Sequence, residues 1–112
     1  MKEEVRRAIA HAAAARANGE ARSNVYSYST SKYTHMGSKK EAGYDYDVGA
    51  HISKSGSGLH HYGTNAHISL KVNGLSFSGY DYDSGHHFSG RVHGHNIQIY
   101  DYGEGSYFSY SA

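Results

Sequence analysis

The chain has 112 residues, and its 11 Lys and Arg nearly balance its 10 Asp and Glu, so overall charge selects neither nucleic acid nor any other strongly charged partner. It contains no cysteine, which excludes disulfide bonds and thiolate metal sites and suits a reducing, cytoplasmic location. No apolar run is long enough to span a membrane, and residues 1–7 lack the apolar core of a secretory signal.

The composition is dominated by 12 Tyr, 10 His and 14 Gly, which is also typical of disordered low-complexity chains. Aliphatic residues nevertheless alternate regularly from residue 66 onward, and low-complexity chains do not show such a pattern. We therefore expect residues 1–112 to fold as a single domain around one modest core.

Residues 1–19 predict a helical segment, with the helix itself over residues 2–18. Most of its middle is alanine, the strongest helix former, and Asn18-Gly19 suits a C-terminal cap. The apolar stripe at helical spacing is thin and consists of Val5, Ile9, Ala13 and Ala17. Because such a helix is weak alone, we expect it to cover the apolar face of a sheet.

From residue 24 the sequence changes to the period of two that is typical of strands. The pattern predicts one strand over 24–34, a charged loop over 37–43, a hairpin over 43–53 and a Ser/Gly loop over 53–58, with residues 59–62 ambiguous. The fold class is therefore α+β and mostly β, with an N-terminal helix followed, over residues 24–112, by an antiparallel meander of about six to eight strands.

One hairpin motif is repeated in the sequence. The stretch Gly43–Ser53 begins Gly-Tyr-Asp-Tyr-Asp, and so does Gly79–Ser89, while Tyr100–Ser109 is a looser third copy. Each copy predicts a strand end, a turn that contains glycine and a restarting strand.

Turns set the register of the meander. Asn73-Gly74 is a strong two-residue hairpin signal and would pair Val72 with Leu75. The later turns would pair Tyr82 with His87, His93 with Asn96, and Tyr102 with Tyr107. All four turns place the same aliphatic residues on one face, unless Gly79 forms a bulge that reverses the faces after it.

Two aspartates fall on the apolar side of this sheet. Asp81 and Asp101 stand at strand ends, where we expect them to reach solvent or to meet Arg6 or Arg7 of the helix. An unpaired buried carboxylate would cost several kcal/mol, so burial without any partner would contradict the register.

The other face of the sheet is rich in tyrosine and histidine. As candidate binding residues we single out Tyr44, Tyr46, Tyr80, Tyr82, His87, Arg91, Tyr100, Tyr102 and Tyr107. These residues could simply stabilise the sheet, because tyrosine favours strands and cross-strand aromatic pairs contribute roughly 0.2–1 kcal/mol each. Alternatively they form an interface, since monomers rarely leave so large an aromatic patch uncovered.

The histidines leave an alternative open, a His-based metal protein or a small hydrolase. Neither His60-His61 nor His86-His87 can chelate an ion from a regular strand, because adjacent residues point to opposite faces. The sequence also lacks a Gly-x-Ser-x-Gly motif and a phosphate-binding loop. We therefore predict no catalytic residue, no metal site and no cofactor.

These observations favour a small, non-catalytic, intracellular binding protein that engages a protein partner, or a second copy in a homodimer, through the tyrosine face. Direct binding of nucleic acid is not expected, because aspartates between the tyrosines would repel phosphates. In size and composition the chain resembles small phage or mobile-element inhibitors, including anti-CRISPR proteins. That resemblance implies an inhibitor of a nucleic-acid-handling protein.

Overall fold

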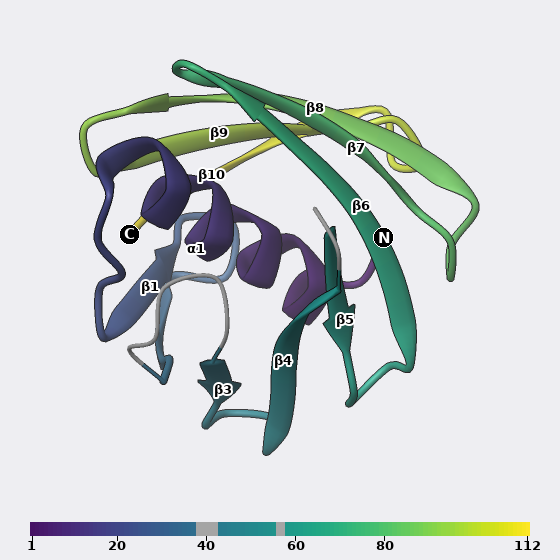
Figure 1. The fold of residues 1–112 in the computed structure, drawn as a ribbon, viewed down its shortest axis with the longest axis horizontal. Helices are drawn as coiled ribbons and strands as arrows, with labels where there is room; N and C mark the ends of the chain where they lie inside the picture. The colour runs from purple at the N-terminus through teal and green to yellow at the C-terminus, as the bar shows by residue number, and fades with distance from the viewer. Residues whose placement is uncertain (38–42, 56–57) are drawn as a thin grey trace.

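The computed structural model describes residues 1–37, 43–55 and 58–112, and within these ranges it contains one helix and ten strands (Figure 1). The helix α1 spans Glu3–Asn18. The strands are β1 (Asn24–Ser27), β2 (Lys32–His35), β3 (Gly43–Asp45), β4 (Ala50–Ser55), β5 (Gly58–His61), β6 (Ala66–Asn73), β7 (Ser76–Asp81), β8 (His86–His93), β9 (Asn96–Asp101) and β10 (Ser106–Ser111). Among these residues, α1 is neither long nor apolar enough to cross a membrane.

All ten strands belong to one antiparallel sheet in the order β2-β1-β10-β9-β8-β7-β6-β5-β4-β3. The two edge strands approach each other, because Met36 bridges to Asp45 and the amide of Tyr46 donates to the carbonyl of His35 at 3.0 Å. The sheet therefore curls into a nearly closed, barrel-like shape (Figure 1). The antiparallel, mostly β architecture is confirmed, but the strand count exceeds the six to eight predicted.

The helix lies inside this curled sheet rather than against one flat face (Figure 1). Every residue from Val5 to Ala15 is buried, and Ala10 and Ala13 are 0% exposed. An alanine-rich helix is thin, which lets strands from both halves of the sheet approach it closely. The scarcity of large apolar residues thus follows from enclosure and not from weak docking. The predicted C-terminal cap is present at Gly19, whose φ is +75°.

The strand predicted over 24–34 is wrong, because it contains a hairpin between β1 and β2. Its turn ends at Ser31, whose φ of +56° is uncommon for a residue other than glycine, so the usual Gly signal is missing. Residues 58–61, which include much of the ambiguous 59–62, form β5, and β4 extends through Ser55, which shortens the predicted loop over 53–58. Most of the predicted loop over 37–43 lies outside the described residues.

Three of the four predicted hairpin pairings are displaced by one residue on each strand. The first turn is Gly74-Leu75, with Asn73 paired to Ser76, because positive φ occurs at Gly74 alone (+63°). Leu75 is consequently 55% exposed instead of belonging to the apolar face. In two later hairpins Asp81 pairs with His86 and Asp101 pairs with Ser106, each one residue before the predicted pair. The predicted pairing of His93 with Asn96 is confirmed.

These displacements leave the faces unchanged, because each one moves the pairing by one residue on both strands at once. Phe88, Ile97 and Ile99 point into the core as predicted, and Tyr110 is fully buried. Gly79 forms no bulge and pairs regularly with Leu70 and Phe88. The alternating pattern therefore predicted the faces more reliably than it predicted the turns.

Candidate functional site

Five hairpins at one end of the sheet share a pattern. Each has a four-residue loop that begins with an exposed tyrosine: Tyr28, Tyr46, Tyr62, Tyr82 and Tyr102. Each loop ends with a residue of positive φ: Ser31, Gly49, Asn65, Gly85 and Gly105. The hairpin motif that occurs three times in the sequence is thus a fivefold structural repeat within the described residues.

The residue before each of these loops points into the core and is buried: Ser27, Asp45, His61, Asp81 and Asp101. In Asp101 the Oδ1 atom accepts the backbone N–H groups of Gly103 at 2.9 Å and Glu104 at 3.3 Å. Asp45 caps its loop in the same way, through the amides of Asp47 and Val48. Aspartate recurs here because its carboxylate satisfies loop amides from the inside.

The remaining carboxylate oxygens of two of these aspartates face the helix. Arg7 Nε donates to Asp45 Oδ2 at 2.8 Å, and Arg6 Nη1 donates to Asp101 Oδ2 at 3.0 Å. The predicted contact of Asp101 with a helix arginine is therefore present. The expectation for Asp81 is wrong, because Asp81 is buried and its carboxylate accepts hydrogen bonds from Ser84 Oγ and the Asp83 amide of its own loop. These contacts place the loops after Asp45 and Asp101 at the end of the sheet where the helix begins. The other three loops lie at the same end, because successive strands of the sheet alternate in direction.

On the outside, each loop tyrosine packs on a ring of the preceding strand, and that ring packs on a third across the hairpin. Neighbouring ring centroids lie 4.3–4.9 Å apart in all five clusters. We call these fifteen rings the aromatic belt. Its members are Tyr26, Tyr28 and Tyr33; Tyr44, Tyr46 and His51; His60, Tyr62 and His67; Tyr80, Tyr82 and His87; and Tyr100, Tyr102 and Tyr107.

All the tyrosines and the histidine singled out from the sequence belong to the aromatic belt. Arg91 is exposed on the same outer face but pairs with Ser76 and Gln98, further along β8 from the belt. The belt members that sequence reasoning did not select are Tyr26, Tyr28, Tyr33, His51, His60, Tyr62 and His67. The spacing Tyr-x-x-Gly, relaxed to Asn or Ser at the last position, would have found the two missing loop tyrosines.

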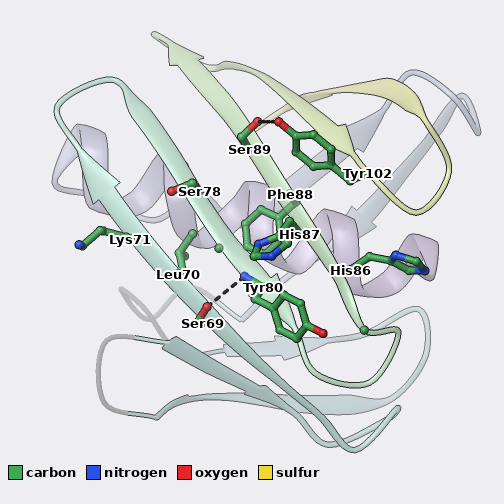
Figure 2. A pocket seen from close by; sticks show the side chains of 12 residues that line it. Ser69, Leu70, Lys71, Ser78, Tyr80, His86, His87, Phe88, Ser89 and Tyr102 are labelled. Atoms are coloured by element: carbon green, nitrogen blue, oxygen red, sulfur yellow. Dashed lines mark hydrogen bonds between the residues drawn. The ribbon is translucent and has the colours of Figure 1, made fainter.

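A shallow groove of about 740 Å³ runs beside the belt on the outer face of β6, β7 and β8 (Figure 2). Its floor carries the small hydroxyl side chains of Ser69, Ser78 and Ser89, and Tyr80, His87 and Tyr102 border it. The Ser69 hydroxyl accepts the amide hydrogen of Tyr80 at 3.0 Å, and the hydroxyls of Ser89 and Tyr102 lie 3.5 Å apart. The groove therefore combines aromatic walls with hydrogen-bonding groups, as ligand and protein interfaces do.

Two buried histidines should make the fold sensitive to acid. Burial lowers the pKa of His11, although its hydrogen bond to the Arg22 carbonyl at 2.7 Å opposes the shift, and burial likewise lowers the pKa of His61. The unfolded chain then binds protons more readily than the folded protein. The stability that these neutral histidines contribute is therefore fully present above the pKa of histidine in the unfolded chain, about 6.5, and is lost as pH falls below that value. We expect the melting temperature to drop between about pH 7 and about pH 5.

The matched variants for this prediction are His11→Gln and His86→Gln. The first should reduce the pH dependence, because glutamine does not titrate, and the second, at an exposed position, should retain it. A melting temperature that stays constant across this range in the unaltered protein would contradict the assignment.

Among the described residues, no three side chains of His, Cys, Asp or Glu gather in a way that could hold a metal ion. The chain matches no protein-family model, and comparisons with curated proteins and with solved structures find no significant similarity.

Proposed function

We propose that this protein is a non-catalytic binding protein that engages a protein partner through the aromatic belt and the adjacent groove. The observation that carries the proposal is the exposure of the five loop tyrosines, which is between 56% and 66%. These side chains lie outside the core and do not enclose the helix, so the packing of the interior does not account for them.

The geometry of the belt suits an interface. Each loop tyrosine rests edge-on against its strand neighbour, as Tyr102 does on Tyr100 with centroids 4.7 Å apart and planes at 76°. A ring that is already held in place loses little conformational entropy on binding. Tyrosine also combines a large contact area with a polar tip, which explains why interfaces are enriched in it.

The charges beside the belt favour a basic partner. Asp83 and Glu104 are exposed in the loops that carry Tyr82 and Tyr102. They would repel a phosphate backbone and attract lysine or arginine. A second copy of this chain would bring the same acidic loops, so we favour a different protein. An inhibitor of a nucleic-acid-handling protein is one special case, since such proteins carry basic surfaces.

The double substitution Tyr82→Ser with Tyr102→Ser tests this proposal. Both residues are exposed loop positions and each loses one ring contact, so we expect the free energy of unfolding to fall by only about 1–2 kcal/mol. Two aromatic anchors contribute roughly 2 kcal/mol each, so affinity for the partner should fall at least about 100-fold. The partner is identified by cross-linking in the native host, and its dissociation constant is then measured with purified proteins.

Leu75→Ser is the matched control, because Leu75 is similarly exposed, at 55%, but lies in a turn at the opposite end of the sheet. It should leave the affinity unchanged. Equal affinity for the double variant and the unaltered protein would reject the belt as the interface. Unfolding of the double variant would show instead that these tyrosines act mainly on stability.

A further inference from the structure

One cluster of the aromatic belt differs from the other four because two histidine rings face each other in it. His60 of β5 pairs directly with His67 of β6, and their Nδ1 atoms are 3.3 Å apart. At the corresponding place the other clusters pair a tyrosine with a histidine or with a second tyrosine, as Tyr80 pairs with His87.

The distance between the two nitrogens matches the coordination geometry of zinc. Two imidazole nitrogens bound to a tetrahedral ion at about 2.0–2.1 Å must lie about 3.3–3.4 Å apart. A square-planar ion would require a shorter separation, about 2.8–2.9 Å, at similar bond lengths. The histidine pair therefore already has the spacing of two tetrahedral ligands.

We propose that His60 and His67 form a binding site for Zn²⁺ on the outer face of β5 and β6. His67 is exposed and His60 is half-buried, so an ion can reach the pair from solvent. The ring of Tyr62 packs against His60 with centroids 4.3 Å apart and restrains it, which lowers the entropy lost on binding.

Zinc binding changes the tautomer of one ring. In the present arrangement one Nδ1–H donates to the other Nδ1, so one of the two rings carries its proton on the nitrogen that must bind the ion. That ring moves its proton to Nε2, and both Nδ1 lone pairs then bind Zn²⁺, with no net loss of protons from the neutral pair.

The protein supplies two ligands, since no group of three potential ligands gathers among the described residues. Water fills the other positions of the tetrahedron. We therefore expect reversible binding of one ion, weaker than at a structural zinc site with four protein ligands. Adjacency in the sequence did not indicate this site, because the two histidines become neighbours only through the pairing of β5 with β6.

Isothermal titration of the untagged protein with ZnCl₂ tests the site. One equivalent should bind to the unaltered protein, and His67→Asn or His60→Asn should each weaken binding at least about 10-fold, as expected for the loss of one of two ligands. His87→Asn is the matched control, because His87 occupies the same hairpin position but faces Tyr80. It should leave the affinity unchanged.

A second measurement does not depend on variants. In nuclear magnetic resonance spectra of the unaltered protein, zinc should shift the imidazole signals of His60 and His67 before those of His51 and His87. Three results would overturn the proposal: no zinc binding by the unaltered protein, unchanged affinity after His67→Asn, or an equal loss after His87→Asn. Each outcome is independent of whether the belt binds a protein.

Discussion

Gly79→Ala should prevent the sheet from closing and should destabilise the protein by more than about 4 kcal/mol. A Cβ atom at this position would lie 1.9 Å from the carbonyl oxygen of Ser69 and 2.6 Å from Cζ of Phe88. The phenylalanine ring could rotate away, but the carbonyl belongs to the neighbouring strand β6 and cannot move without breaking the ladder. Even a methyl group is therefore too large here.

Gly90→Ala should have a comparable effect, because its Cβ would lie 2.2 Å from the Gln98 carbonyl oxygen and 2.4 Å from Cζ of Phe77. Ser78→Ala is the control, since Ser78 is exposed and adjacent to Gly79, and its effect should stay within about 0.5 kcal/mol. Urea denaturation measures all three. If Gly79→Ala were as stable as Ser78→Ala, the close approach of β6 to β7 would be wrong.

These two glycines explain how the sheet curves around the helix. Gly79 is inward-facing and lies beneath the ring of Phe88, while Gly90 lies beneath that of Phe77. Glycine permits bends within strands, and a neighbouring aromatic ring restores the buried apolar surface that the glycine lacks. The curvature in turn encloses α1 and spreads the five hairpin loops around one end of the molecule (Figure 1).

The sequence was informative where a residue type has one physical meaning. The alanine run and Asn18-Gly19 predicted the helix and its end, and the alternation after residue 66 predicted the inward face. It was less informative where several residue types can adopt the same backbone conformation. Ser31 and Asn65 adopt the positive φ that Gly85 adopts in an equivalent loop, so two hairpins lacked their usual signal.

The candidate site was likewise predictable from the sequence only in part. The tyrosines of the repeated motif were recognisable as one surface, because the motif is nearly identical in two copies. The copy that contains His60 and Tyr62 was not recognisable, since histidine replaces both tyrosine and aspartate in it. The facing of His60 and His67 depends on strand pairing across a loop, which residue spacing alone does not fix.

Asp101→Asn is expected to destabilise the protein by about 3 kcal/mol or more, because it removes one partner from a buried ion pair. The carboxylate is fully buried, and its Oδ2 lies 3.0 Å from Arg6 Nη1 and 3.3 Å from the amino group of Met1. Asparagine has nearly the same shape, and its Oδ1 can still accept the Gly103 amide. The substitution therefore tests the charge and leaves the loop cap in place.

The same variant should change the response to strong acid. Burial by itself would raise the pKa of Asp101, but hydrogen bonds from Arg6 and the Glu104 amide, together with the nearby amino group, lower it overall. The folded protein therefore binds this proton less readily than the unfolded chain. The resulting stability is present above the unfolded pKa of about 3.9 and is lost as pH falls through the lower folded value. Asp101→Asn should lack this part of the acid transition.

Asp83→Asn is the matched control, because Asp83 belongs to the equivalent hairpin but is exposed. It should change the free energy of unfolding by less than about 0.5 kcal/mol. Urea denaturation at neutral pH and thermal melts down to about pH 3 compare the two variants. Equal stability of Asp101→Asn and Asp83→Asn would mean that Arg6 finds an equally good environment without the carboxylate, and the ion pair would then contribute nothing to holding the helix inside the sheet.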